Sequence, residues 1–374
     1  MTYLIQRRNP NISSSLPTLS FDLISEILSK LPVKHLLQFR CVCKYWNSLI
    51  SDHKFARKHL NGSITRSSLQ CVSYHTPSSN FILKSYPIQS IFADITTNFI
   101  RPEFSSNFIF RHNIHYIVGS CDGILCLANY YKPLVVLCNP SIRKFQELSP
   151  FDNPRVDSQP NMTCGFGYDH VSRNYKVVVV YYFYKKGIPE DTSKVKVHTL
   201  GTDSWKSIKM FPSDAVFSEK SGKYVNGTIN WLAFLKRRPS DPPFIVSFDL
   251  NKESYQKVLL PDPGGIDVFN LTSCVFRDWL CIISDHDVWV MKEYGIKESW
   301  IKLFNFSCLR DPIKTSILTN VIYIFEHDLV LLEFSCHEKN KLFLYNSKNG
   351  TFKSVAMFRS TLEVCVESLI SPCF

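Results

Sequence analysis

The stretch Gly119-Ser-Cys121-Asp-Gly123 has the spacing of a nucleophile elbow in which cysteine stands in place of serine. A thiol at such a turn could attack a carbonyl carbon if a histidine, itself held by a carboxylate, took up its proton. The same residues also suit a tight turn between two strands, because Asp-Gly is a strong hairpin signal. The first interpretation describes an enzyme, and the second gives Cys121 no chemical role.

The residues after Gly123 favour the hairpin. A nucleophile elbow needs a strand, a turn and then a helix. Here the apolar residues come in short runs, interrupted at Asn129 and at Lys132-Pro133, which indicates two strands and a loop. The chain also contains no His-Glu-x-x-His, no phosphate-binding glycine loop and no dinucleotide fingerprint. We therefore expect no catalytic residue, no metal ligand and no cofactor.

Length and composition describe a globular chain of more than one domain. With 374 residues, the chain is too long for one ordinary core. Its 13 cysteines are scattered without a Cys-x-x-Cys pair, and its first residues lack the apolar segment of a signal peptide. The longest apolar runs are too short to cross a bilayer. We expect reduced thiols in a cytoplasmic or nuclear protein with no membrane contact.

The net charge of +11 at pH 7 could favour nucleic acid as a partner. The basic residues are spread along the chain, however. In the C-terminal part the only compact cluster, Lys236-Arg237-Arg238, lies in a predicted loop before Pro239. A solvated surface is the simpler interpretation, so we do not expect nucleic acid to bind. A binding protein that contacts nucleic acid or another assembly through its basic surface stays open as an alternative function.

The segment that ends near Gly62 has the apolar spacing of three short helices. In the first, Leu23, Ile27 and Leu31 lie on one broad face, and Pro32 ends it and begins the second. Gly62 is a suitable stop for the third. A domain of this size has more apolar side chains than its own core can hide. The surplus predicts a surface that another protein covers.

The rest of the chain is typical of an all-β fold, because short apolar runs alternate with turn residues. A strand, a polar turn and an aromatic residue recur at a period near 50 residues, as four-stranded propeller blades require. About six blades fit the available length, although glycine is scarce at 13 residues. An irregular β-sandwich with coincidental aromatics is the other interpretation. The recurring aromatics are Phe145, Trp205, Tyr255, Trp300 and Phe352.

The helical segment resembles an F-box, with "EILSKLPVK", "RCVCKYW" and "LISD" in the family's order and spacing. The β part resembles the F-box-associated, kelch-related domain of plant F-box proteins in "GSCDGILCL", "LCNPSIRKF" and "YVNGTINWLA". The resemblance implies a mixed fold of an N-terminal three-helix F-box and an all-β, propeller-like domain of about six blades. We expect a disordered N-terminus at residues 1–15, the F-box at 16–62 and the propeller-like domain at 63–374.

The resemblance further implies a substrate-recognition subunit of an SCF-type ubiquitin ligase, which performs no chemistry itself. The F-box docks on a Skp-type adaptor, and through it on a cullin scaffold, while the β domain captures an unknown protein target for ubiquitination. We expect about half of the matched F-box residues to face the adaptor and the others to form the core. The adaptor-binding residues carried over from the F-box motif are Leu19, Leu23, Ile27, Leu28, Leu31, Pro32, Val33, Leu36, Leu37, Val42, Cys43 and Trp46.

Two departures from the family pattern affect these expectations. Leu19-Ser20 stands where the F-box usually has Leu-Pro before its first helix, so we expect a slightly looser helix entry and retained binding. Kelch blades carry paired glycines, whereas the only Gly-Gly pair here is Gly264-Gly265, in a loop. The blade count therefore rests on the period of the aromatics.

Charged and loop residues complete the predicted binding surfaces. Lysines and arginines around the F-box surface would speed encounter with an acidic adaptor more than they would tighten the complex. These basic residues are Lys30, Lys34, Arg40 and Lys44. For the target, the candidate loops are 185–193, 236–243 and 261–267, which carry charge and proline.

Overall fold

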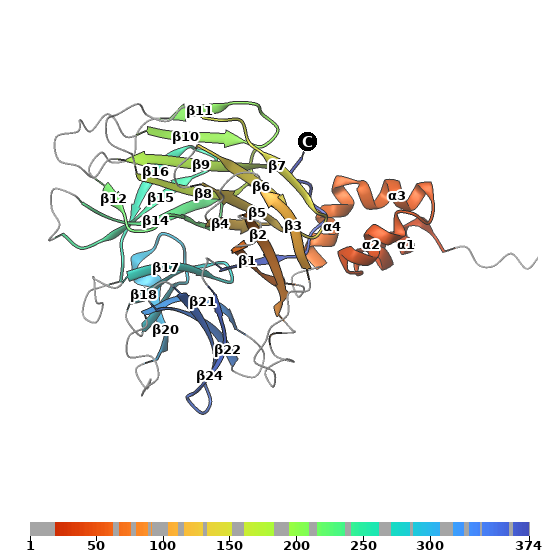
Figure 1. Cartoon of the computed structure of the whole chain (residues 1–374). Helices are drawn as coiled ribbons and strands as arrows, with labels where there is room; N and C mark the ends of the chain where they lie inside the picture. The colour runs from red at the N-terminus through yellow and green to blue at the C-terminus, as the bar shows by residue number, and fades with distance from the viewer. Residues whose placement is uncertain are drawn as a thin grey trace, which may run out of the picture.

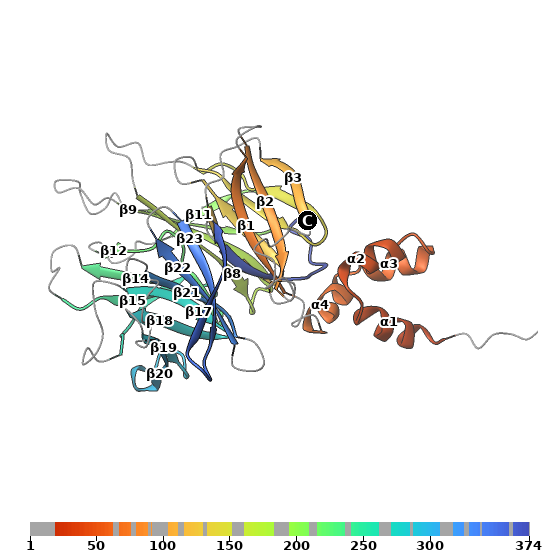
Figure 2. The same cartoon turned by 60° about the horizontal axis from the view of Figure 1, so that its bottom comes forward.

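The computed structural model shows a small helical domain beside a large ring of β-sheets (Figure 1), and a turned view shows the same separation (Figure 2). The expected disorder of residues 1–15 lies outside the described residues. The structure describes residues 19–62, 67–75, 80–88, 91, 104–110, 116–129, 133–151, 161–182, 194–208, 215–235, 241–261, 271–284, 287–306, 317–324, 329–336, 339–358 and 362–373.

The helical domain contains four helices where the sequence predicts three. They are α1 (Phe21–Ser29), α2 (Val33–Phe39), α3 (Lys44–Ser51) and α4 (His53–Gly62). The third predicted helix is divided at Asp52, whose backbone is extended with ψ 134°. The Asp52 carboxylate accepts hydrogen bonds from the N–H groups of Lys54 at 2.8 Å and Phe55 at 3.0 Å, and so caps a new helix.

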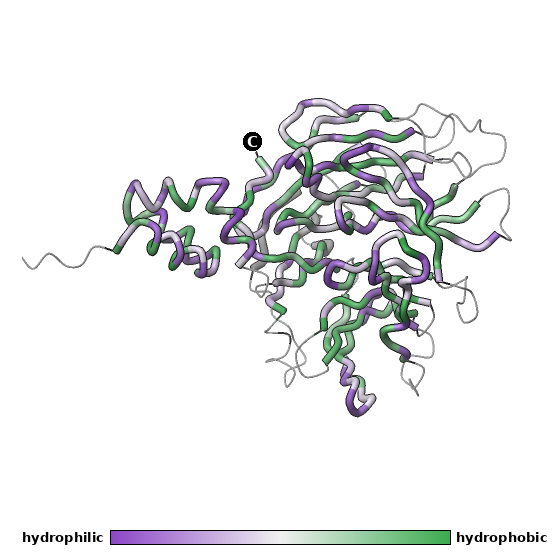
Figure 3. Tube along the Cα trace, turned by 180° about the vertical axis from the view of Figure 1, so that it is seen from behind, coloured by the Kyte–Doolittle hydropathy of each residue, from purple (hydrophilic) through white to green (hydrophobic). Residues whose placement is uncertain are grey.

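Hydrophobic and hydrophilic stretches alternate along these helices (Figure 3), as they do in helices with one packed face. Two further side chains fix where the helices begin. Ser20 Oγ accepts the N–H of Leu23 at 3.4 Å before α1, and Cys43 Sγ accepts the N–H of Trp46 at 3.5 Å before α3. Among the described helices, none is long and apolar enough to cross a membrane.

The β part is a six-bladed ring, as the period of the aromatics predicts. Each blade is an antiparallel sheet with its strands in chain order, apart from blade 1. Blade 1 contains β25 (Leu362–Val366), β1 (Ser67–His75), β2 (Asn80–Pro87) and β3 (Phe104–Phe110); blade 2 contains β4 (Tyr116–Cys121), β5 (Ile124–Ala128), β6 (Val135–Asn139) and β7 (Lys144–Glu147); blade 3 contains β8 (Asn161–Asp169), β9 (Asn174–Tyr182), β10 (Lys194–Thr199) and β11 (Trp205–Ile208).

The other three blades complete the ring. In blade 4 the first strand is divided, and both halves pair with the second strand. Blade 4 contains β12 (Ala215–Phe217), β13 (Lys223–Val225), β14 (Thr228–Leu235), β15 (Phe244–Asp249) and β16 (Ser254–Val258); blade 5 contains β17 (Leu271–Phe276), β18 (Trp279–Ser284), β19 (Asp287–Met291) and β20 (Trp300–Asn305), with the short 3₁₀ helix η4 (Lys297–Ser299) before β20; blade 6 contains β21 (Ile317–Ile324), β22 (Leu329–Cys336), β23 (Lys339–Asn346) and β24 (Thr351–Phe358).

Both ends of the β part contribute to blade 1, and this closes the ring. Strand β25 pairs with β1 in the register Ser67↔Val366 to Cys71↔Leu362. The C-terminal strand is thereby the innermost strand of the first blade. Closure of this kind leaves no open sheet between the first and last blades, which removes two edges that could pair with other chains.

Buried apolar clusters lie between successive blades all around the ring. Val72 of blade 1 shares a cluster with Leu127 of blade 2, and Leu331 of blade 6 shares one with Leu69 of blade 1. The cluster between blades 2 and 3 extends without interruption into the helical domain. Each fully buried side chain of this type contributes about 1.5–3 kcal/mol, so face-to-face packing is the main source of stability.

The recurring aromatics all lie at the start of a blade's fourth strand, but their burial differs. Trp300 is buried, whereas Phe145 is 54% exposed, so equal packing depth is not the reason for the repeat. Two of them connect neighbouring blades instead. Trp205 Nε1 donates to the carbonyl oxygen of Ser149 at 2.7 Å, and Trp300 Nε1 donates to that of Leu259 at 3.0 Å.

Candidate functional site

Six large apolar side chains of the helical domain are exposed among the described residues, and we call this set the exposed apolar face. Leu23 and Ile27 lie one turn apart on α1 and are 52% and 51% exposed, and Val42, between α2 and α3, is 60% exposed. The rings of Phe21 and Tyr45 are in contact, with centroids 4.6 Å apart, which joins α1 to α3. The exposed apolar face consists of Leu19, Phe21, Leu23, Ile27, Val42 and Tyr45.

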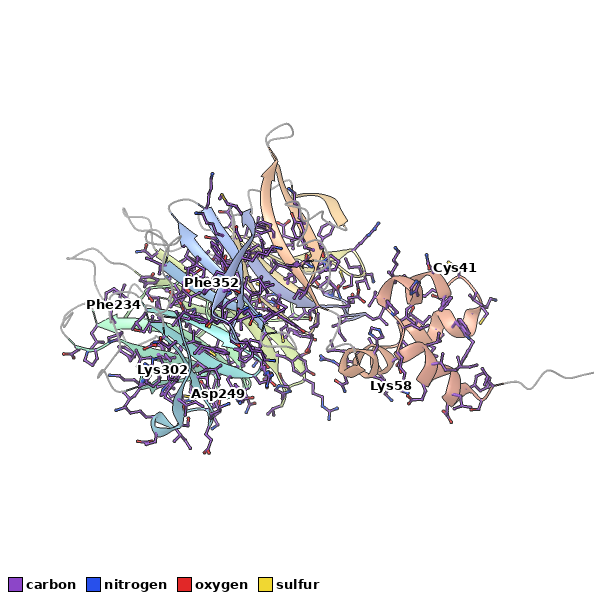
Figure 4. All side chains as sticks on the ribbon, turned by 90° about the horizontal axis from the view of Figure 1, so that it is seen from below. Cys41, Lys58, Phe234, Asp249, Lys302 and Phe352 are labelled. Atoms are coloured by element: carbon purple, nitrogen blue, oxygen red, sulfur yellow. The ribbon has the colours of Figure 1, made fainter. Side chains whose placement is uncertain are left out.

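The face belongs to the part of the helical domain that projects from the ring. Helix α4 lies nearest the ring, and α1, α2 and α3 extend beyond it (Figures 1 and 2). Cys41, next to Val42, lies on this outer part (Figure 4). A cluster of large apolar side chains on a small domain indicates a surface for another protein.

The structure divides the predicted adaptor-binding residues into three groups by exposure. The exposed group is Leu19, Leu23, Ile27, Val42 and Cys43. The partly exposed group is Leu31, Pro32, Leu37 and Trp46, and the buried group is Leu28, Val33 and Leu36. Adaptor binding by the exposed and partly exposed residues stays a prediction.

The buried group shows which of the matched residues lie in the core of the helical domain in this structure. Leu28, Val33 and Leu36 are at most 2% exposed and lie in the apolar cluster that continues into blades 2 and 3. We therefore assign these three side chains to the helical core. Sequence spacing could not separate them from their neighbours, because Ile27 and Leu28 both fall on the broad apolar face of α1.

Two aromatic residues of the exposed apolar face are not among the adaptor-binding residues predicted from the sequence. Phe21 is the first residue of α1, and Tyr45 is the second of α3. Both lie outside the leucine and isoleucine spacing by which the surface was predicted. The available signal is position: each is a large aromatic in the first turn of a short helix, with Phe21 between Ser20 and Asp22 and Tyr45 after Lys44.

Basic side chains are exposed on the same helices and turns as the exposed apolar face. Lys30, Lys34, Arg40 and Lys44 are all exposed, and Arg40 Nε donates to Asn47 Oδ1 at 2.9 Å. On α1 and α4, Lys58 pairs with Glu26 at 2.6 Å and lowers the pKa of that carboxyl. The exposed lysines and arginine near this surface favour an acidic partner.

Cys121 lies at the end of a strand and not in a nucleophile elbow. Strands β4 and β5 are joined by the two-residue turn Asp122–Gly123, with φ of 52° and 81°, which confirms the predicted hairpin. The Cys121 side chain is buried, and burial raises the pKa of its thiol well above the usual value. A thiol in this state is a poor nucleophile.

The charge of one lysine acts on the carboxyl groups of glutamates from three blades. Burial raises the pKa of Glu219, Glu363 and Glu333, the last to about 7, while the charge of Lys223 acts in the opposite direction on each. The N–H of Ser273 donates to Glu219 at 2.6 Å, so one of these carboxylates connects blades 4 and 5. In the described part of the chain, no group of three or more histidine, cysteine, aspartate or glutamate side chains is arranged to hold a metal ion.

The predicted target-binding loops 185–193, 236–243 and 261–267 lie largely outside the described residues. The strands on either side of them are described. Residues 183–193 connect the second and third strands of blade 3, and residues 259–270 lead from blade 4 to blade 5. In an antiparallel blade, the ends of the strands that bound such a connection lie at the face opposite to the turn between the first and second strands.

A helical domain with an exposed apolar face, joined to a six-bladed ring, defines a two-domain propeller protein. Comparison with known families matches residues 16–58 to the F-box domain and residues 79–372 to the F-box associated beta propeller domain. The chain therefore belongs to the F-box proteins that carry this propeller domain.

Relatives of similar length support the assignment. An F-box/kelch-repeat protein of Arabidopsis thaliana is 32% identical, over 95% of this chain and 96% of its own. The F-box protein CPR1 of the same plant is 28% identical, over 95% of this chain and 89% of its own. Among solved structures, TolB from Acinetobacter baumannii superposes with a TM-score of 0.46 at 10% identity, covering 83% of this chain and 70% of that one. This last likeness is too distant to bear on function.

Proposed function

We propose that the chain is the substrate-recognition subunit of an SCF-type ubiquitin ligase. In this proposal, the F-box docks on a Skp-type adaptor, which connects it to a cullin scaffold, and the propeller holds a protein target. The observation that carries the proposal is the exposed apolar face at the outer end of the helical domain. The subunit itself performs no chemistry and acts by holding the target near the ligase.

The energetics of docking require several apolar side chains together. A fully desolvated leucine or isoleucine contributes about 1.5–3 kcal/mol. Association costs about 4–15 kcal/mol of translational and rotational freedom. When a partner covers them, Leu23, Ile27 and Val42 can offset much of this association cost. Leu31, Leu37 and Trp46 add contact area.

The target is expected on the ring face away from the F-box. Arg57 of α4 contacts Asp122 in the turn between the first two strands of blade 2, so the F-box lies at that face. Connections of many residues, at 183–193, 236–243 and 259–270, have their strand ends on the opposite face. Long loops on a rigid ring are suited to recognition. Replacing 183–193 with a short Gly-Ser turn should change the proteins recovered by proximity labelling and leave adaptor binding intact; an unchanged set would count against this face.

Binding of a purified Skp-type adaptor tests the docking proposal. The double substitution Leu23→Ala and Ile27→Ala should weaken binding by about 3 kcal/mol, roughly a hundredfold in Kd, measured by calorimetry. The matched control is Val171→Ala with Leu259→Ala, which removes two aliphatic side chains that are exposed on the ring, at 72% and 48%. Wild-type affinity in the helix variant, or an equal loss in the control, would show that the exposed apolar face is not the docking surface.

A further inference from the structure

The C-terminal end of the ring reaches the helical domain. After β25 the chain continues as residues 367–373, which we call the C-terminal strap. Asn139 Nδ2 donates to the carbonyl oxygens of Ser368 at 3.0 Å and Ile370 at 2.7 Å, which fixes the strap on blade 2. Leu369 and Ile370 lie in the same apolar cluster as the core residues of the helices. The strap therefore belongs to the ring and to the helical core at once.

Glu367 of the strap completes the start of helix α2. Pro32 precedes this helix and offers no side-chain hydrogen bond to it. Glu367 Oε2 accepts the N–H of Val33, the first residue of the helix, at 3.3 Å. A carboxylate here satisfies a free N–H group and interacts favourably with the helix dipole. A residue from one end of the chain thus caps a helix at the other end.

Helix α4 is attached to the ring by an ion pair. Arg57 on α4 pairs with Asp122 in the β4–β5 turn, and the two side chains are only 25% and 27% exposed. Tyr175 Oη donates to the same carboxylate at 2.8 Å. The Arg57 guanidinium lies over the rings of Tyr168, at 4.3 Å, and Tyr175, at 5.3 Å from the centroids. Partial burial makes this pair stronger than one on an open surface.

The β4–β5 turn also contacts the strap, so the two attachments meet. A Cβ atom on Gly123 would lie 2.2 Å from Ser368 Cβ, which shows how closely the turn and the strap are packed. From α4 the contacts continue to the helices of the exposed apolar face. The buried His59 has a ring nitrogen 2.8 Å from the carbonyl oxygen of Leu31, just before α2.

We propose that adaptor docking and ring closure are energetically coupled through this junction, an inference that rests on the proposed function of the F-box. The strap and the β4–β5 turn do not form the exposed apolar face, but they hold the helices that do. An adaptor that prefers this helix arrangement binds more weakly when the junction is loosened. Because coupling is reciprocal, the bound adaptor also stabilises β25 and the strap in the ring.

Two near-isosteric substitutions in the full-length chain test the coupling. Glu367→Gln weakens the cap of α2, and Asp122→Asn removes the charge that pairs with Arg57. Each should raise the Kd for the purified Skp-type adaptor about fivefold. The matched control is Asp287→Asn, because Asp287 pairs with Lys302 at 2.6 Å within blade 5, and the apolar cluster of the helices extends into blades 2 and 3 instead. Hydrogen exchange of the β25 and strap amides, with and without adaptor, gives an independent readout.

The outcomes separate the coupling from the proposed function. Coupling predicts weaker binding in both junction variants, unchanged binding in the control, and slower exchange in β25 when the adaptor is bound to wild type. If both variants bind the adaptor with wild-type affinity, and the bound adaptor does not change hydrogen exchange in β25, the coupling alone is overturned. A wild-type chain that does not bind the adaptor would overturn the docking function and the coupling together.

Discussion

Arg57 in helix α4 forms an ion pair with Asp122 in the turn between β4 and β5, and this contact joins the helical domain to the ring. The turn is the part of the chain whose spacing resembles a nucleophile elbow. Its aspartate instead binds a guanidinium, and its glycine packs against the C-terminal strap. The aspartate and the glycine of this turn therefore have a structural role, which is to join the two domains.

Loss of the interdomain ion pair should destabilise the protein measurably. Arg57→Ala removes the charged partner of Asp122 and leaves the carboxylate its hydrogen bond from the Tyr175 hydroxyl, so we expect the free energy of unfolding to fall by about 1–2 kcal/mol. Lys206→Ala is the control, because its side chain is 68% exposed in its pair with Glu253, and exposed pairs contribute about 0–1 kcal/mol. Urea denaturation measures the free energy of unfolding of both variants. Equal losses would show that the interdomain pair contributes no more to stability than an exposed pair.

Gly123 should tolerate substitution much less well than another glycine with the same backbone conformation. Gly123 and Gly295 have φ of 81° and 85°, so alanine is strained at both. At Gly123 the new Cβ would also lie 2.2 Å from Ser368 Cβ and 2.8 Å from the carbonyl oxygen of Val366, whereas at Gly295 nothing lies within 4 Å.

Gly295→Ala should therefore cost about 1 kcal/mol from the backbone alone. Gly123→Ala should cost at least about 2 kcal/mol more, because the strap must move. Thermal and urea unfolding of the two variants measure the difference. Similar losses would mean that the strap yields easily, and that its packing against the turn contributes little.

Local pattern was enough to predict much of the fold. The strands follow from short apolar runs with turn residues between them, and six blades follow from aromatics such as Trp205 and Trp300, which recur at one strand position. The β4–β5 hairpin follows from Asp122–Gly123 alone. Each of these features depends on residues close together in the sequence.

The rest depended on contacts between distant segments, which leave no local signal. Nothing near Ser67 indicates that it pairs with Val366, or that Glu367 caps α2. For the same reason the exposure of Ile27 and the burial of Leu28, its neighbour, could not be separated. The division of the third helix at Asp52 was missed because the apolar spacing continues across it, and only the aspartate cap reveals the break.

Alkylation should distinguish the cysteines of the helical domain from the cysteine of the hairpin. Cys41 and Cys43 are exposed, whereas Cys121 is buried and burial raises the pKa of its thiol. Brief treatment of the native protein with iodoacetamide should label Cys41 and Cys43 and leave Cys121 unlabelled, as read by peptide mass spectrometry. Labelling in denaturant, where all three should react, is the control. Rapid native labelling of Cys121 would revive its interpretation as a nucleophile.

The buried carboxyl of Glu333 should make stability depend on pH. Its pKa is raised by burial from 4.5 to about 7, so between these values the folded state keeps a proton that the unfolded state has lost. Its contribution to stability therefore falls as pH rises from about 4.5 to about 7, and stays low above that. The full change amounts to about 3 kcal/mol.

Glu333→Gln removes this titration while keeping a group that can accept from Asn340, which donates to Glu333 Oε1 at 2.7 Å. The variant should gain stability relative to wild type as pH rises, with the gain complete near pH 8. Chemical denaturation at pH 4, 6 and 8 measures it, and Glu298→Gln, at an exposed position on η4, should follow wild type throughout. A constant difference between Glu333→Gln and wild type at all three values would mean that Glu333 does not titrate differently in the folded and unfolded states.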